Sequence, residues 1–178
     1  MDITIRAAKE SDIDGILDIV NGYAAQNLML FRTEEQIKRA LPGFIVAVAG
    51  GKVMGCGSNV PLTPRLVELR SLAVAPEARS TGLGRQLVEV LVAMARDAGY
   101  DQICALTLSE GFFNKCKFAT VDRWSITPKI WQECIYCQKF DACDEIAVLL
   151  NLREPAVVPE TRGVISLRPA FARQGWGS

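Results

Sequence analysis

The sequence ELRSLAVAPEARSTGLGR, which runs from Glu68 to Arg85, decides the fold of this chain. Its first part has the apolar character of a strand, and Pro76 ends that strand. The glycine-containing turn from Arg79 to Gly84 then opens a helix. A helix N-terminus after such a turn presents free backbone N–H groups and the positive end of the helix dipole, so it favours an anion. The stretch therefore predicts a phosphate site where a strand passes into a helix.

The spacing of the two glycines narrows the class of this loop. It lacks the Gly-Lys-Ser/Thr ending of an NTPase loop and the longer Gly-x-Gly-x-x-Gly of a dinucleotide fold. It resembles the Arg/Gln-x-x-Gly-x-Gly/Ala loop of the GNAT superfamily of N-acetyltransferases, which binds the pyrophosphate of acetyl-CoA. The alternative is a purely structural strand-to-helix turn.

The resemblance implies acetyl-CoA as the cosubstrate and direct transfer of the acetyl group to an amine. The strand before the loop would hold the pantetheine through backbone groups, and the loop would hold the phosphates. The cofactor-binding residues expected on this basis are Leu72, Ala73, Val74, Arg79, Ser80, Thr81, Gly82, Leu83, Gly84, Arg85 and Asn114.

Length and composition set the broad class of the protein. The 178 residues fit one domain, and the 20 basic and 20 acidic residues cancel, so no strong field favours nucleic acid or an anionic membrane. No basic run precedes an apolar segment, and no stretch of about 18 apolar residues is present, so we expect a soluble, cytoplasmic protein. Histidine is absent, which excludes imidazole chemistry.

Periodicity and capping signals give an alternation of strands and helices. Ser11 and Thr33 are predicted to cap the first two helices, and Gly50-Gly51 predicts a hairpin turn. The predicted strands are 3–6, 44–49, 52–60, 66–75, 102–108, 118–124 and 144–150, and the predicted helices are 13–24, 34–41, 83–98 and 111–116.

These elements alone indicate a single α/β or α+β domain. The resemblance implies the GNAT fold, a mixed and mostly antiparallel sheet with helices on both faces. We expect this domain to occupy residues 1–152. Residues 153–178 hold several prolines and glycines without periodicity, so they are expected to form an extended or disordered tail.

Three further runs resemble the short, single-domain N-acetylglutamate synthase type of amino-acid N-acetyltransferase, whose reaction begins arginine biosynthesis. They are Leu28 to Glu35, Gly111 to Lys115 and Pro128 to Glu145. The chain also departs from the family pattern. Phe112 and Phe113 stand where many GNAT enzymes place a tyrosine that protonates the leaving thiolate, so the general acid is unassigned.

Charged residues supply candidates for catalysis and for binding an acidic acceptor. Glu68 occupies the strand position where several GNAT enzymes place the base that takes the amine proton; the alternative is a residue that is solvated or ion-paired with Arg70. An ordinary carboxyl pKa of about 4 makes a poor base toward an ammonium, so burial or a water relay is needed. Arginine suits carboxylates, and the acceptor-binding candidates are Arg32, Arg70 and Lys139.

Cys134, Cys137 and Cys143 leave several interpretations open. Three thiols are one ligand short of a structural zinc site, so we assign no metal, and a redox-sensitive pair is an alternative. The partner expected is a small amino acid, and a homodimer is possible. The rival functions are a GNAT enzyme with another amine acceptor, such as a protein N-terminus, a polyamine or an antibiotic, and a non-catalytic CoA-binding or thiol-sensing module.

Overall fold

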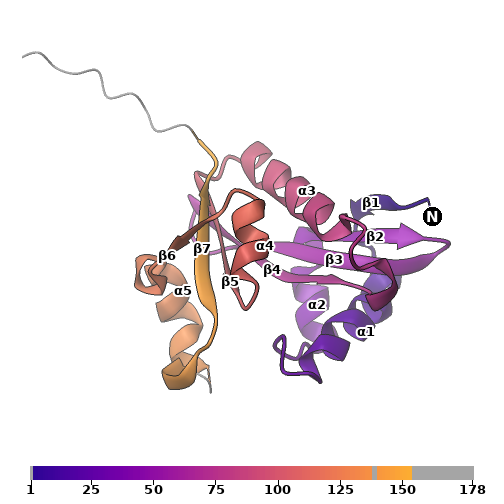
Figure 1. Ribbon diagram of the computed structural model, residues 1–178, viewed down its shortest axis with the longest axis horizontal. Helices are drawn as coiled ribbons and strands as arrows, with labels where there is room; N and C mark the ends of the chain where they lie inside the picture. Colours follow the sequence, from indigo (N-terminus) through magenta and orange to yellow (C-terminus); the bar gives the residue numbers. More distant parts are fainter. Residues whose placement is uncertain (1, 138–139, 154–178) are drawn as a thin grey trace, which may run out of the picture.

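The computed structural model describes residues 2–137 and 140–153. Seven strands form one sheet in the spatial order β1-β2-β3-β4-β5-β7-β6 (Figure 1). The strands are β1 (Thr4–Ala7), β2 (Phe44–Ala49), β3 (Lys52–Pro61), β4 (Leu66–Val74), β5 (Gln102–Thr107), β6 (Ala119–Val121) and β7 (Ile146–Asn151). The α-helices are α1 (Ile13–Ala24), α2 (Glu34–Ala40), α3 (Leu83–Asp97), α4 (Glu110–Lys115) and α5 (Thr127–Gln132).

The sheet is mixed and mostly antiparallel, as predicted. Strands β1 to β4 pair antiparallel, β4 and β5 pair in parallel, and β7 pairs antiparallel with both β5 and β6. The parallel pairing covers only Leu66–Glu68 against Gln102–Cys104. Beyond that point the two groups of strands run in different directions (Figure 1).

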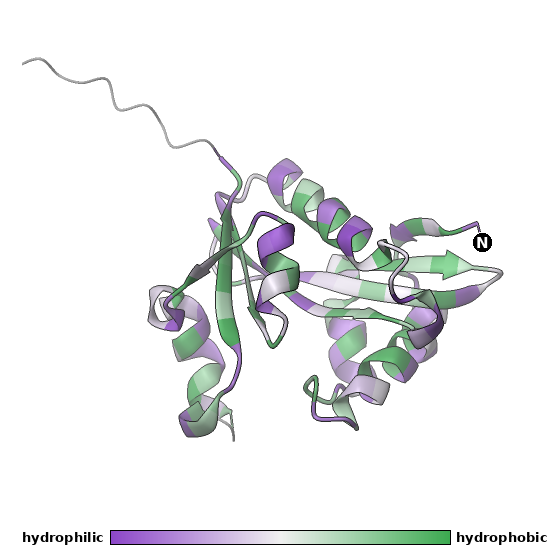
Figure 2. Cartoon of the chain, viewed as in Figure 1, coloured by the Kyte–Doolittle hydropathy of each residue, from purple (hydrophilic) through white to green (hydrophobic). Residues whose placement is uncertain are grey.

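Helices cover both faces of the first group of strands, because alternate side chains of each strand point to opposite faces. On β2, Ile45 and Ala47 belong to the core cluster under α3, whereas Phe44 and Val46 belong to the cluster under α1 and α2. The strands are accordingly apolar along most of their length, and polar residues lie on the outer side of α3 (Figure 2). No helix among the described residues is long and apolar enough to span a membrane.

Local sequence signals placed most elements within one or two residues. The capping box at α2 is present, with Gln36 N–H donating to Thr33 Oγ1 at 3.3 Å and Thr33 N–H donating to Gln36 Oε1 at 3.0 Å. The cap predicted at Ser11 is wrong. Asp12 organises that turn instead, because its carboxylate accepts the Lys9 N–H at 2.8 Å and pairs with Arg6 at 2.7 Å.

The region after α4 differs most from the prediction. The strand predicted over 118–124 shortens to β6, because Phe118 N–H bonds back to the carbonyl of Phe113 and the Asp122 side chain caps a 3₁₀ turn over Arg123–Ser125. Helix α5 was not predicted. It has only six residues, too few to show a period, and it is held by burial of Ile130. The predicted tail lies outside the described residues except for Arg153.

Gly43, between α2 and β2, provides a test of the packing. A Cβ at this position would lie 2.2 Å from the backbone oxygen of Asn59, which has no freedom to move away. We expect Gly43→Ala to lower the free energy of unfolding by about 2 kcal/mol or more in urea titrations. Gly22→Ala is the matched control, because nothing lies within 4 Å of its added Cβ. That variant should gain about 0.5–1 kcal/mol from helix propensity. Equal stability of the two variants would contradict the close packing of Gly43 against the Asn59 backbone.

Candidate active site

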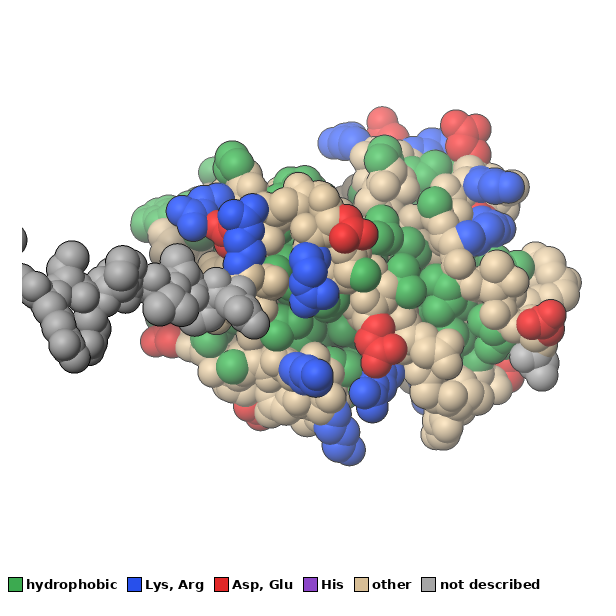
Figure 3. Space-filling model, turned by 90° about the horizontal axis from the view of Figure 1, so that it is seen from above, with side chains coloured by type: hydrophobic (Ala, Val, Ile, Leu, Met, Phe, Trp, Pro, Cys, Tyr) green, Lys and Arg blue, Asp and Glu red, His purple; other side chains and the backbone are tan. Residues whose placement is uncertain are grey.

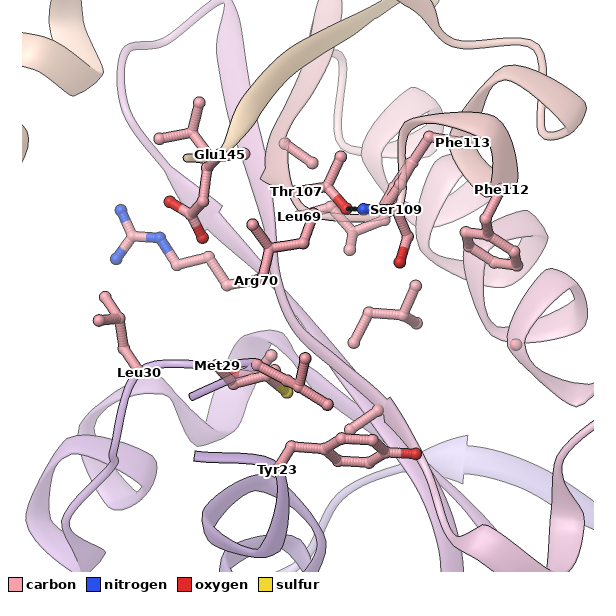
Figure 4. Close-up of a pocket in the computed structure, with 18 of the residues that line it drawn as sticks. Tyr23, Met29, Leu30, Leu69, Arg70, Thr107, Ser109, Phe112, Phe113 and Glu145 are labelled. Atoms are coloured by element: carbon pink, nitrogen blue, oxygen red, sulfur yellow. Dashed lines mark hydrogen bonds between the residues drawn. The ribbon is translucent and has the colours of Figure 1, made fainter. Parts of the chain in front are cut away.

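The divergence of β4 from β5 opens a cavity of about 550 Å³. Its walls come from β4, the end of β5, helix α4, the α1–α2 loop and α5 (Figure 4). The register between β3 and β4 shifts within this region, and Ser71 on β4 has a φ of 51°. A bulge of this kind redirects the strand, so Arg70 and Ser71 both line the cavity.

The loop predicted to bind phosphate lies at one end of this cavity. Gly82 has a φ of 84° and is the N-cap of α3, a left-handed conformation that favours glycine. Thr81 Oγ1 donates to the carbonyl of Ala78 at 2.7 Å, which closes the turn. The first N–H groups of the 15-residue helix α3 therefore face outward without an intrahelical partner. This geometry suits an anion.

The predicted cofactor residues take different positions around the loop. Leu72, Ala73, Val74, Arg79 and Gly84 line the cavity. Leu83 is buried in the core instead, and Arg85 is exposed and ion-paired with Glu89 at 2.9 Å. Ser80, Thr81 and Gly82 form the exposed turn. Asn114 lies on the exposed side of α4, 3.5 Å from the hydroxyl of Thr120, and does not line the cavity.

Tyr23, from the last turn of α1, connects the strand to the loop and was missed by sequence reasoning. Its hydroxyl donates to the carbonyl of Val74 at 2.6 Å and accepts from Arg79 Nε at 2.9 Å. The Arg79 guanidinium also lies 5.0 Å from the centre of the Tyr23 ring, a cation–π contact. In sequence Tyr23 looks like any residue of an amphipathic helix, so no local signal marks it.

Four alternating charges form a closed ring between β4 and α5. Glu68 pairs with Arg70, and also with Lys129 at 3.0 Å. Glu133 completes the ring, since it pairs with Arg70 at 2.5 Å and with Lys129 at 2.6 Å. Glu68 is only 3% exposed and Lys129 only 8%. Both oxygens of the Glu68 carboxylate are therefore engaged by cations, in line with the ion-paired alternative for this residue.

The ring shifts the pKa values of Glu133 and Arg70. Burial acts to raise the pKa of the Glu133 carboxyl, but the hydrogen bond and charge of Lys129 and the charge of Arg70 outweigh it, so the pKa lies below its ordinary value. Burial acts to lower the pKa of Arg70, and the carboxylates of Glu68 and Glu133 raise it above its ordinary value. Both shifts favour the charged form, because Glu133 and Arg70 each lie beside groups of opposite charge.

Arg32 is held at the mouth of the cavity by its backbone. Asn21 Nδ2 donates to the carbonyl of Arg32 at 3.0 Å, and the N–H of Arg32 donates to Asn21 Oδ1 at 2.9 Å. Burial, and then the positive charge of Arg70, lower the pKa of the Arg32 guanidinium. Its side chain has no hydrogen bond or ion pair within residues 2–137 and 140–153. A half-buried guanidinium of this kind lacks an anion.

A second cavity of about 590 Å³ adjoins the first and shares Arg32, Arg70 and Ser71 with it. It is formed by α2 and the end of β3, and it contains no residue of the phosphate loop. Over the face seen in Figure 3, basic and acidic side chains are interspersed, so no field of one sign covers it.

The remaining candidates are placed as follows. Lys139 lies outside the described residues. Phe113 is buried, and its ring packs edge-on against Phe112 and Phe118, so neither phenylalanine of α4 supplies an acidic proton. Ser109 lies at the cavity wall, where its N–H donates to Thr107 Oγ1 at 2.9 Å (Figure 4). The described cysteines are free thiols, and no group of three potential metal ligands is found among the described residues.

Comparisons with known proteins agree with this geometry. Residues 14–118 match the model of the acetyltransferase (GNAT) family. An uncharacterized N-acetyltransferase from Chlorobaculum tepidum is 38% identical over 151 residues, which cover 85% of this chain and 97% of that protein. An amino-acid acetyltransferase from Mycobacterium tuberculosis is 28% identical over 166 residues, which cover 92% of this chain and 94% of that protein.

Solved structures show the same fold. A Mycobacterium tuberculosis protein in complex with CoA and NLQ superposes with a TM-score of 0.73 at 25% identity, over 84% of this chain and 99% of that one. N-acetylglutamate synthase from Neisseria gonorrhoeae, complexed with coenzyme A and N-acetyl-glutamate, gives a TM-score of 0.74 at 21% identity, over 86% of this chain and 36% of that one. The CoA bound to the Mycobacterium tuberculosis protein agrees with acetyl-CoA as the cosubstrate. The chain belongs to the GNAT family of acetyltransferases.

Proposed function

We propose that this protein transfers the acetyl group of acetyl-CoA to the α-amine of a free amino acid, with L-glutamate as the first choice of acceptor. Glutamate would place the reaction at the first step of arginine biosynthesis. The observation that carries the proposal is the half-buried guanidinium of Arg32 at the junction of the two cavities, which has no ion pair within the part of the chain that the structure describes. The free thiols of the described cysteines support a cytoplasmic location.

The acetyl donor fits the first cavity. The N-terminus of α3 and the Arg79 side chain supply the positive groups that a diphosphate requires. The backbone of β4 from Leu72 to Val74 borders the path from that loop toward Arg70. A thioester laid along this strand would reach the bulge at Ser71, where the two cavities meet.

The acceptor fits the junction. A carboxylate paired with Arg32 would neutralise the one guanidinium there that has no partner within the described chain, and bidentate pairing would orient the amine. Arg70 already pairs with two carboxylates, so as an acceptor-binding residue it would act mainly through its charge. A direct transfer needs the amine and the thioester in one place, which two adjoining cavities provide.

We retain Glu68 as the proposed base for the amine proton, with one restriction. Arg70 and Lys129 occupy its two carboxylate oxygens, so the proton would pass through a water molecule. The positive charges of Arg32 and Arg70 would also favour the neutral form of an amine bound between the two cavities. The proton donor for the departing thiolate stays unassigned.

Tyr23→Phe tests the donor site. The variant removes the hydroxyl that positions Arg79 and the Val74 carbonyl, and a hydrogen bond to a charged group contributes about 1.5–3 kcal/mol. We expect the KM for acetyl-CoA to rise about 10-fold or more, with a smaller change in kcat. Tyr100→Phe is the control, because this half-buried tyrosine packs on the core away from the loop. An unchanged KM for acetyl-CoA in Tyr23→Phe would remove Tyr23 from the donor site.

A panel of amino acids tests the acceptor. Purified protein with acetyl-CoA should give the N-acetylated product of glutamate, detected by mass spectrometry, ahead of glutamine and uncharged amino acids. Arg32→Ala should raise the KM for glutamate about 10- to 100-fold, because a charged bidentate contact is lost. Arg65→Ala is the control, since this exposed arginine pairs with Asp101 far from the cavity.

Two results would redirect the assignment. Turnover of a polyamine, an antibiotic or a peptide N-terminus that does not depend on Arg32 would favour another acceptor. Binding of acetyl-CoA without turnover of any amine would favour a non-catalytic module, for which the missing tyrosine at Phe112 and Phe113 is the encouraging feature.

Glu68→Gln tests the base. General-base catalysis contributes about 10²–10⁴-fold, so kcat should fall by about that factor and the acidic limb of its pH profile should disappear. Glu133→Gln is the matched control, because it breaks the same ring and leaves the Glu68 carboxylate in place. If both variants lose activity equally and keep the wild-type pH profile, Glu68 is not the base and contributes only to the ion pairs of the ring.

A further inference from the structure

Cys134 and Cys137 share a single turn directly after α5. Cys134–Tyr136 is a 3₁₀ turn in which the N–H of Cys137 donates to the carbonyl of Cys134 at 3.0 Å. A turn closed in this way brings its first and fourth Cα atoms to within about 7 Å. Disulfides bridge Cα atoms about 4.4–6.8 Å apart. The pair can therefore be bridged without unfolding the turn.

Two other thiols of the described chain, Cys56 and Cys104, are poorly placed to compete. Cys56 and Cys104 are buried, and burial raises the pKa of each to about 12. Burial also raises the pKa of Cys116. Cys134 and Cys137 are both partly exposed, so reagents in solution can reach them. Cys116 and Cys143 are partly exposed as well, so this turn is distinguished by its geometry, which holds two accessible thiols within bridging distance.

The turn is coupled to the charged ring. Cys134 directly follows Glu133, whose carboxylate pairs with Arg70 and Lys129. Burial raises the pKa of the Cys134 thiol, and the charges of Lys129 and Glu68 lie close enough to act on that pKa too. Drawing the Cys134 side chain toward Cys137 would therefore displace the adjacent Glu133 and disturb its ion pairs.

We propose that Cys134 and Cys137 form a reversible dithiol–disulfide site that low-molecular-weight disulfides oxidise, and that oxidation weakens the ion pairs of Glu133. This inference does not rest on the identity of the acceptor. The Cys137 thiolate attacks one sulfur of oxidised glutathione and releases the first glutathione as a thiol. The Cys134 thiolate then attacks Cys137 and releases the second. The two protein thiols together lose two electrons and two protons. Oxidised glutathione takes them up and becomes two molecules of glutathione thiol.

Peptide mapping tests the site. The full chain is incubated with excess oxidised glutathione, free thiols are alkylated, and trypsin cleaves after Lys129 and Lys139. Residues 130–139 then hold both cysteines, whereas Cys143 falls in the separate peptide 140–153. We expect the first peptide to lose two hydrogen atoms and to escape alkylation. A bridge that joins the two peptides, or full alkylation of Cys134 and Cys137, would overturn the proposal.

Variants assign each thiol. Cys143→Ser should keep the internal disulfide, and Cys137→Ser should abolish it. Retention of the bridge in Cys137→Ser, or its loss in Cys143→Ser, would contradict the pairing. Because the readout is mass, a protein without turnover gives the same information as an active one, so failure of the proposed function is distinguished from failure of this site.

Thermal unfolding tests the coupling to Glu133. Oxidation should lower the Tm of the wild-type chain by about 2–4 °C, the shift expected for about 1 kcal/mol in a domain of this size. The shift should be less than half as large in Glu133→Gln, where the ion pairs are already absent. An equal shift in both chains, or no shift in the wild type, would show that the turn and the ring are independent.

Discussion

The short parallel contact between β4 and β5 is the constraint on which this structure depends. Three residues on each strand pair, and then the strands diverge. A continuous sheet would leave no space between them, whereas this divergence creates a cavity bordered by unpaired edges of both strands. The bulge at Ser71 and the end of β5 face that cavity because they lie on the two strands that separate, and the phosphate loop reaches it because it follows β4.

Where the strands diverge, polar backbone and charged side chains face a low-dielectric interior. The charged ring offsets the cost of burying those charges. Moving one ion out of water costs several kcal/mol even after relaxation, unless an opposite charge lies beside it. Each member of the ring has two opposite neighbours, so Glu68 and Lys129 can be buried. The ring also fixes α5, a helix too short to be stable alone, against β4. In contrast, Arg32 keeps a half-buried charge that has no partner among the described residues, which is the arrangement of a site that awaits an anionic ligand.

Much of the fold was predictable because its signals are local. The capping box at Thr33, the glycine turn between β2 and β3 and the strand–turn–helix around Gly82 each depend on residues a few positions apart. The family followed from the same stretch. Predictions failed where local signals are short or where a distant residue changes the outcome. Helix α5 and the shortened β6 belong to the first kind, and the cap taken over by Asp12 through its pair with Arg6 belongs to the second.

By itself, the sequence determined the order of the elements, the anion-binding loop and membership of the acetyltransferase family, since these rest on backbone preferences and hydrogen bonds within short segments. Only the tertiary structure decided which side chains meet. Tyr23 contacts Val74 and Arg79, which follow it by 51 and 56 positions in the chain. The carboxylate of Glu68 is shared between its neighbour Arg70 and the distant Lys129. Such contacts depend on how helices dock on the sheet, and a linear pattern of residue types does not encode the distance between two charges until packing has fixed it.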